Sequence, residues 1–503
     1  MCRHQAAIRI KQIKDNNKQN ALHKWQQSII NTIKEKLNNE NSTIVKADKS
    51  KAIVIIQKTC LQEKITNFLQ DNDIPHITKD PTNKYNKQIH NIAQQCKLII
   101  NKHTNRHLTN LQPKAPQLNV MIKTHKENLP IRPVVNNTCA PSHKIAKFLN
   151  KKLKNMEILP NIYNIKNCLD VAQDITKLHL NKHMTLITLD IKDLYTNLPK
   201  IGIINATKFW LHSKSHNMDE NKQIITLLKT IMEQNYFQHN ENFYKPHKAV
   251  AMGSPLSGTL AELYLQNIKH KYIKQWLDSK EIHYYRRYVD DIIILINTQK
   301  IQEEQVINNI NSINNNLSFS MTQEESNKTN FLDLTLIRNN SNIEINKYRK
   351  ETCTDTVIHY HSNHPTEQKM AAFWYYINRL ITLPLTQKGK DIEWATILNL
   401  AKHNGFPIEK ITRLKTQLIT RLHKDYTPPE KLKKWSTFTY HSPAIRKITN
   451  LFKNSIVGIA FKSKNIILKQ ITNKKYEETD PSGIYSISCN TCNKKYIGQT
   501  DQH

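Results

Sequence analysis

The chain has 503 residues, and its 74 Lys and Arg against 41 Asp and Glu give a formal net charge of +33. Hydrophobic residues make up 38%, enough for the cores of several domains, and no apolar run reaches the ~20 residues that span a bilayer. This composition excludes a membrane-spanning protein and favours a polyanionic partner, although an AT-rich coding sequence would also enrich Lys, Asn and Ile.

Cysteine usage and the N-terminus bear on the compartment. Six of the eight cysteines are isolated in the sequence, which argues against a disulfide framework and for a reducing environment. Residues 1–18 are basic but have no apolar signal core. We therefore expect a protein of the nucleus, with the cytoplasm as the alternative.

The first 110 residues are expected to form a mainly helical region. Apolar residues recur at helical spacings over 5–40, and two short strands at 43–49 and 52–56 flank an Asp-Lys-Ser-Lys turn. Further helices, interrupted at Pro75 and Pro81, occupy 60–110.

A basic hairpin is predicted next. The strands are Met121–Lys126 and Ile131–Val135, joined by a turn with Pro130. A hairpin of this kind can reach over a triphosphate, to which Arg132 would offer a bidentate fork and Lys123 and Lys126 point charges. With 74 basic residues in the chain, either lysine could also stand there by chance.

The central part alternates strands and helices without a simple βαβ rhythm, so we expect an α+β fold with a sheet backed by helices. The predicted strands lie at 184–190, 284–296 (a strand–turn–strand), 317–321, 331–336 and 342–349. The predicted helices lie at 142–153, 203–210, 221–234, 257–275, 301–316 and, in large part, 366–450.

Three carboxylates stand at the ends or turns of these apolar strands. Asp190 ends the first strand, and Asp290 and Asp291 occupy the tip of the strand–turn–strand. Nucleotidyl transfer needs two divalent cations held roughly 3.5–4 Å apart, and Mg²⁺ prefers oxygen ligands such as Asp. The set therefore predicts a template-dependent polymerase. Asp-Asp can also mark an ordinary turn, but Asp190 makes the catalytic interpretation the better one.

Several ordered motifs resemble those of reverse transcriptases, in particular the polymerases of Penelope-like retroelements. They are Lys123-Thr124-His125-Lys126 followed by Arg132-Pro133, the stretch 252–257, Tyr-Val-Asp-Asp at 288–291, and 327–334. The resemblance implies a right-hand polymerase with fingers, palm and thumb. We expect fingers and palm over 111–350, a helical thumb over 351–450 and a connector over 451–482.

The resemblance also implies roles for individual residues. Asp190, Asp290, Asp291 and the backbone carbonyl of Ile191 would hold two Mg²⁺ or Mn²⁺ ions, with Asp291 in less direct contact. Tyr195 would pack under the sugar of a dNTP and exclude a 2′-hydroxyl, unless it is a plain core aromatic. Gly253 and Ser257 would contact nucleotide and template, although Met252 stands where many reverse transcriptases have Gln.

The C-terminal segment 483–503 resembles the opening of a GIY-YIG endonuclease, through Gly483-Ile484-Tyr485 and Tyr496-Ile497-Gly498. Because the Arg and Glu of such a nuclease would lie beyond His503, we expect this part to be truncated and inactive. Cys489 and Cys492 have the spacing of half a zinc site, but two free thiols are the favoured interpretation.

The resemblance thus implies an RNA-directed DNA polymerase that extends a DNA primer on an RNA template, using dNTPs. A catalytically dead, nucleic-acid-binding remnant of a retroelement is the alternative, and the intact aspartates, Tyr195 and Arg132 weigh against it. A telomerase-like enzyme is disfavoured, because no dedicated RNA-binding domain is evident upstream.

Overall fold

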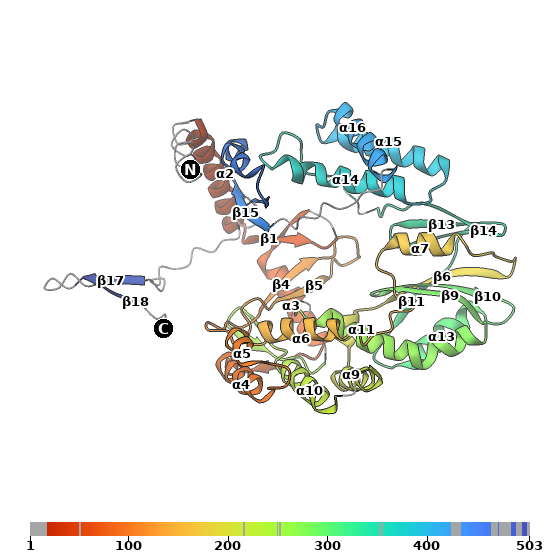
Figure 1. The fold of residues 1–503 in the computed structure, drawn as a ribbon, viewed down its shortest axis with the longest axis horizontal. Helices are drawn as coiled ribbons and strands as arrows, with labels where there is room; N and C mark the ends of the chain where they lie inside the picture. The colour runs from red at the N-terminus through yellow and green to blue at the C-terminus, as the bar shows by residue number, and fades with distance from the viewer. Residues whose placement is uncertain are drawn as a thin grey trace. The chain divides into compact units, whose positions relative to one another are not determined.

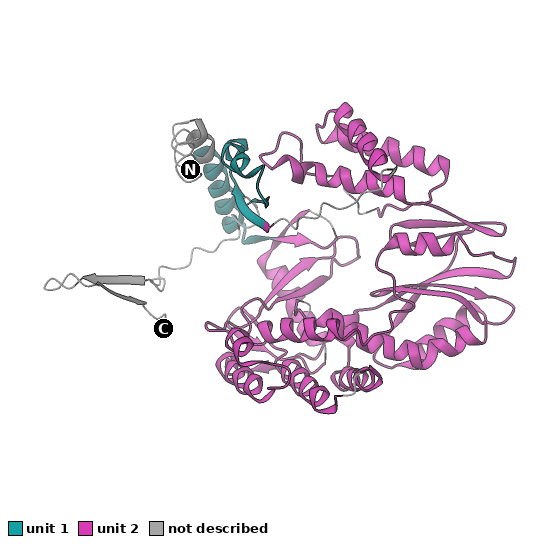
Figure 2. Cartoon of the chain, in the orientation of Figure 1, with its two compact units in different colours: residues 1–44, 435–503 teal, residues 45–434 magenta. Residues whose placement is uncertain are grey.

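The computed structural model describes residues 18–49, 52–214, 217–248, 250, 253–351, 353, 356–423, 434–463, 471, 484–488 and 495–499. The chain divides into two compact units, one of residues 45–434 and one of residues 1–44 with 435–503 (Figure 2).

The larger unit is organised around a four-stranded antiparallel sheet, the palm. Its order is β11-β6-β10-β9, with β6 at Met184–Ile191, β9 at Ile282–Tyr288, β10 at Asp291–Asn297 and β11 at Phe319–Thr322. Strand β10 reads Asp-Ile-Ile-Ile-Leu-Ile-Asn, and its apolar run is buried throughout. A continuous apolar run indicates that both faces of the sheet are covered.

Alternate residues of β10 enter two different cores, because successive side chains of a strand point to opposite faces. Ile292, Ile294 and Ile296 belong to one core, and Ile293 and Leu295 to the other. In Figure 1, α13 lies on one side of this sheet and α7 on the other.

Helices supply most of the first core. They are α4 (Thr82–Gln95), α5 (Lys102–Leu108), α6 (His143–Asn155), α9 (Lys200–Lys214), α10 (Met218–Glu233), α11 (Ser257–Ile268) and α13 (Glu303–Ile313). Helix α11 continues through a π-helical turn at Lys269–Ile273 into α12 (Lys274–Asp278).

The second core lies between the opposite face of the palm and the C-terminal helices of this unit. It contains α7 (Cys168–Ile175), the three-stranded sheet of β12 (Lys328–Phe331), β13 (Leu334–Asn339) and β14 (Asn342–Lys347), and the helices α14 (Thr366–Thr382), α15 (Gln387–His403) and α16 (Ile408–His423).

A second sheet has seven strands. Five of them precede the palm strands in the sequence, and the other two, β7 and β8, come between β6 and β9. Its order is β2-β1-β4-β7-β8-β3, and β5 pairs with β4. The strands are β1 (Ser42–Ala47), β2 (Ile53–Gln57), β3 (His76–Ile77), β4 (Gln117–Ile122), β5 (Ile131–Asn136), β7 (Phe237–His239) and β8 (Asn242–Tyr244). Helix α3 (Lys58–Asp71) packs against it through Ile65 and Leu69.

The smaller unit contains helix α2 and two two-stranded sheets. Helix α2 spans Lys18–Asn39; β15 (Lys434–Tyr440) pairs with β16 (Val457–Ser463), and β17 (Ile484–Ser488) pairs with β18 (Lys495–Gln499). Short helical turns at Pro443–Ile445, Arg446–Thr449 and Asn450–Phe452 connect the first pair.

The predicted α+β fold, with a palm-like sheet backed by helices, is confirmed. Two local predictions were wrong. The first basic strand occupies 117–122 rather than 121–126, so Lys123 and Lys126 lie in the loop that follows it. Residues 434–440 form a strand instead of a helix, as their aromatic and β-branched side chains favour.

Among the residues that the structure describes, no helix combines the length and the apolarity needed to cross a membrane.

Replacing Ile294 by Ala should strongly destabilise the larger unit. Ile294 has no exposed surface and pairs with Ile187 and Tyr285 in the middle of the palm. The lost contacts and the cavity should cost about 2–5 kcal/mol, seen as a lower urea midpoint in circular dichroism. The conservative Ile294→Val change should cost only about 0.5–1.5 kcal/mol. An unchanged midpoint for Ile294→Ala would show that this strand is not part of a packed core.

Candidate active site

The strand register of the palm brings the predicted carboxylates together. Asp190, the second-last residue of β6, lies directly opposite Asp291, the first residue of β10. Residues paired in this way have Cα atoms about 4.5–5.5 Å apart and side chains on one face. Asp290 lies in the adjoining β9–β10 turn, and its backbone carbonyl accepts a hydrogen bond of 3.2 Å from the amide of Ile191. All four predicted metal-site residues therefore meet at one end of the palm.

The turn that presents Asp290 has an unusual backbone. Val289 has a φ of 53°, in the left-handed region that two-residue hairpin turns require and usually fill with Asn or Gly. A β-branched side chain is a real outlier there, and such a conformation costs about 1–3 kcal/mol. The surrounding structure must therefore hold this turn in place.

Burial and mutual repulsion perturb the acids. Burial, then the charges of Asp290 and Asp190, raise the pKa of Asp291 to about 6. Burial and Asp290 also raise the pKa of Asp190, against the opposing effect of Lys49 and other lysines. A divalent cation would relieve this repulsion.

The donor set fits a hard cation that is only partly held by protein. Within the described parts of the chain, no three His, Cys, Asp or Glu side chains form a ready metal cluster. Mg²⁺ is usually bound by one or two carboxylates, with substrate phosphates and water completing its shell. Two carboxylates on adjacent strands with a third in the turn are compatible with that arrangement.

A cleft of about 1000 Å³ adjoins the acids. Its lining includes two of the three acids, Asp190 and Asp290, together with Ile191. Every predicted nucleotide-binding residue also lines it, namely Lys123, Lys126, Arg132, Tyr195, Gly253 and Ser257. Asp291 is not among the lining residues. The structure thus brings together in one cleft residues from four separate stretches of sequence.

The basic residues of the cleft are held by acids. Arg132 Nε lies 3.1 Å from the carboxylate of Asp48, which is buried, with 5% of its side chain exposed. This is an ion pair without hydrogen-bond geometry, since neither atom has a hydrogen-bond partner, and 38% of the Arg132 side chain stays exposed. Lys123 lies 3.7 Å from Asp193. The fork of Arg132 is therefore oriented but remains accessible from the cleft.

Sequence reasoning assigned no role to two lysines that act on the acids. The charges of Lys49 and Lys350 lower the pKa values of Asp190 and Asp291. The Asp48-Lys49 turn between two strands is a signal that could have pointed to Lys49. Lys350 follows β14, and no local pattern marks it.

Tyr195 lies between the cleft and the first core. It lies on the short helix α8 (Leu194–Asn197), lines the cleft and also packs against the first core. Burial, followed by the charges of Asp290 and Glu262, raises its pKa, and its backbone carbonyl accepts a hydrogen bond of 2.9 Å from the amide of Val250.

Gly253 has a structural reason to be glycine. Its φ is 127°, and a Cβ atom would overlap the backbone carbonyl oxygen of Val135 on β5. The turn before α11 can therefore approach the second hairpin strand only without a side chain. Ser257, the first residue of α11, is buried beside it.

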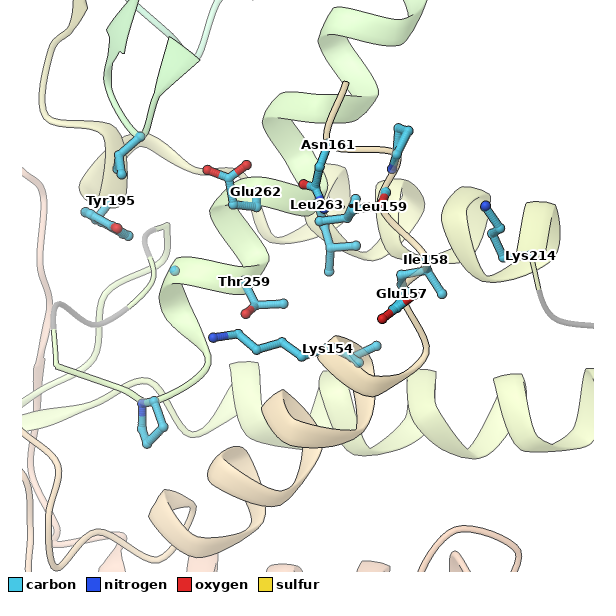
Figure 3. Close-up of a pocket in the computed structure, with 15 residues that line it drawn as sticks. Lys154, Glu157, Ile158, Leu159, Asn161, Tyr195, Lys214, Thr259, Glu262 and Leu263 are labelled. Carbon is cyan, nitrogen blue, oxygen red and sulfur yellow. Dashed lines mark hydrogen bonds between the residues drawn. The ribbon is translucent and has the colours of Figure 1, made fainter. Parts of the chain in front are cut away.

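A second pocket of about 790 Å³ adjoins the cleft, and Tyr195 and Gly258 line both. Figure 3 shows Tyr195, Glu262 and Asn161 along one side of it and Lys154 and Glu157 along the other. Val289 of the β9–β10 turn also lines it. The β9–β10 turn therefore borders both spaces, through Asp290 in the cleft and Val289 in the second pocket.

The residues of the predicted endonuclease start lie in the smaller unit. Tyr485 is on β17, opposite Gly498, and Tyr496 is on β18, opposite Ile487. The predicted zinc half-site, Cys489 and Cys492, lies outside the described residues.

The palm and its turn fall within a recognised family domain. Residues 124–357 match the family described as Reverse transcriptase (RNA-dependent DNA polymerase). The matched span contains the palm sheet, Asp190, Asp290, Asp291 and Tyr195. The chain therefore contains a reverse transcriptase domain.

Solved polymerase structures are similar at low identity. Telomerase from Candida albicans, in complex with a TWJ fragment of telomeric RNA, is 10% identical with a TM-score of 0.46, over 76% of this chain and 68% of that one. Apo telomerase from Candida tropicalis is 12% identical with a TM-score of 0.44, over 76% of this chain and 66% of that one. The Sicinivirus 3Dpol RNA-dependent RNA polymerase is 10% identical with a TM-score of 0.39, over 66% of this chain and 71% of that one. The comparison with curated proteins finds no match.

Asp291→Asn should stabilise the cation-free protein near pH 7.5 and lose this effect below about pH 4. The pKa of Asp291 is about 6 in the folded protein against an ordinary 3.8. In the pH window between these two values, the folded state holds a proton that the unfolded chain releases. Stability of the unsubstituted protein therefore falls as pH rises through it. Melting temperatures in EDTA across this range test the effect. An equal difference at both ends would contradict the raised pKa.

Proposed function

We propose that the chain is an RNA-directed DNA polymerase that joins dNTPs to the 3′-hydroxyl of a DNA primer on an RNA template. The observation that carries this proposal is the register that pairs Asp190 with Asp291 and places Asp290 in the adjoining turn. The reverse transcriptase match over 124–357 supports the same reaction.

The proposed cofactors are two Mg²⁺ or Mn²⁺ ions. Asp190, Asp290, the carbonyl of Ile191 and, less directly, Asp291 would hold them. When bound, such ions neutralise phosphate charge and favour ionisation of the attacking hydroxyl. Because the carboxylates already repel one another, cation binding and deprotonation of Asp291 should favour each other.

The basic side of the cleft would bind the triphosphate. Arg132, oriented by Asp48, can offer a bidentate fork to phosphate oxygens. Lys123 and Lys126, in the loop after β4, line the same cleft and would add point charges. Positioning and charge stabilisation are what phosphoryl-type transfers chiefly need from a protein.

Asp290→Asn should abolish most of the activity. Primer extension on poly(rA)/oligo(dT) with dTTP and Mg²⁺ measures it. Metal-assisted charge stabilisation is worth several kcal/mol, so the loss should be at least about 100-fold. The melting temperature should not fall, because loss of the Asp290 charge relieves the repulsion that acts on Asp190 and Asp291. Full activity of the variant, or none in the parent chain beside an active control enzyme, would contradict the proposal.

Tyr195→Ala should relax sugar selection. We propose that the ring sterically excludes a 2′-hydroxyl, the type of rejection on which specificity often depends. Ribonucleotide incorporation relative to deoxyribonucleotide should rise by at least about 10-fold, a difference near 1.4 kcal/mol. Tyr195→Phe, which keeps the ring, is the matched control and should retain selection. An unchanged ratio for Tyr195→Ala would make this residue a core aromatic only.

We further propose that the chain comes from a Penelope-like retroelement and acts in the nucleus. The ordered polymerase motifs support the first point, and the antiparallel pairing of the segments around Tyr485 and Tyr496 supports kinship with GIY-YIG endonucleases. The net charge of +33 agrees with work on nucleic acid. Any zinc site would need ligands besides Cys489 and Cys492.

A further inference from the structure

We infer that Arg287 is a positioning residue. It fixes the β9–β10 turn that carries Asp290, and its own side chain is held by Glu262 and Asn164. Arg287 directly precedes the Tyr-Val-Asp-Asp sequence and does not line the cleft. The inference rests on the proposed polymerase function, to which it adds the means by which Asp290 is held in place.

The side chain of Arg287 folds back onto its own turn. Only 2% of it is exposed. Its Nη1 donates to the backbone carbonyl of Val289 at 2.7 Å and to Glu262 Oε1 at 3.0 Å. Its Nη2 donates to Glu262 Oε2 at 2.7 Å and to Asn164 Oδ1 at 3.2 Å. One guanidinium thus ties the turn to α11 and to the loop before α7.

Glu262 and Asn164, which bind the Arg287 side chain, are held in place by further contacts. Glu262 accepts further hydrogen bonds from Asn164 at 2.5 Å and from Gln266 at 3.1 Å. Burial alone would raise the pKa of Glu262, but the hydrogen bonds and charge of Arg287, together with the hydrogen bonds from Gln266 and Asn164, outweigh burial and lower the pKa. The Arg287 backbone also pairs with this loop, through 3.1 Å bonds with Tyr163 and Ile165.

The hydrogen bond from Arg287 to the backbone carbonyl of Val289 acts directly on the position of Asp290. It belongs to the peptide group that joins Val289 to Asp290, so fixing it fixes the direction in which Asp290 leaves the turn. Val289 is in the left-handed region, which a β-branched residue keeps only when its surroundings over-determine it. A guanidinium has five donors in a rigid plane, so it can fork a carboxylate and still reach the carbonyl.

Arg287→Lys is the direct test. Lysine keeps the charge but not the fork. Groups that orient metal-site residues typically contribute about 10–100-fold to activity or metal affinity. We expect kcat for primer extension to fall by this factor and the Mg²⁺ concentration for half-maximal rate to rise, with little change in KM for dNTP. Glu262→Gln should give a smaller change of the same kind.

Arg286→Lys is the matched control. Arg286 is the neighbouring residue on the same strand, and it binds Asp174 at 2.7 and 3.0 Å without contacting the turn. This variant should keep kcat and the Mg²⁺ requirement. If Arg286→Lys and Arg287→Lys change kcat and the Mg²⁺ requirement to the same extent, Arg287 serves folding only and the inference is overturned.

A double-mutant cycle with Val289 separates positioning from general packing. Asn adopts the left-handed region more readily than Val. In a Val289→Asn background the turn needs less support, so Arg287→Lys should cost clearly less in kcat than it does in the parent chain. An equal cost in both backgrounds would contradict a role in holding the turn.

Hydrogen exchange tests the same point without activity. The amide of Ile191 donates to the carbonyl of Asp290, so it reports on the turn. Its exchange in the free protein should accelerate in Arg287→Lys and not in Arg286→Lys; equal exchange in both would refute the inference. An inactive parent enzyme would instead refute the polymerase function, which keeps the two failures distinct.

Discussion

The antiparallel pairing of β6 with β10 is the constraint on which the rest of the structure depends. Its register sets Asp190 opposite Asp291, and a slip by one residue would turn every side chain of the strand to the other face. The alternating burial of β10 in two separate cores opposes such a slip. Hydrophobic packing on both sides of the palm therefore fixes the position of the acids.

This arrangement is unfavourable in itself, because it gathers like charges in a partly buried place. The cost appears in the raised pKa values of Asp190 and Asp291 and in the backbone of Val289. The charges of Lys49 and Lys350 offset part of the repulsion, and the network of Arg287, Glu262 and Asn164 holds the turn. Because the acids repel one another, the site is well suited to bind cations, and its basic residues are suited to bind a triphosphate.

Sequence patterns predicted the parts of the site that depend on short-range order. Apolar runs ending in Asp190 and interrupted by Asp290-Asp291 predicted the palm strands. Arg132 and Tyr195, both predicted to contact the nucleotide, line the same cleft. The patterns could not give what depends on distant packing. The ion pair between Glu262 and Arg287 joins residues 25 positions apart, and Lys350 has no local signature. Gly253 was predicted as a site residue, but the contact with Val135 that requires glycine there was not.

The most direct test of the central claim is the location of the cations. Crystals of the protein with primer–template, a non-hydrolysable dNTP and Mn²⁺ would reveal the metal by anomalous scattering. We predict two peaks roughly 3.5–4 Å apart, next to the carboxylates of Asp190 and Asp290 and the carbonyl of Ile191. Manganese bound elsewhere while these carboxylates stay empty would contradict the account.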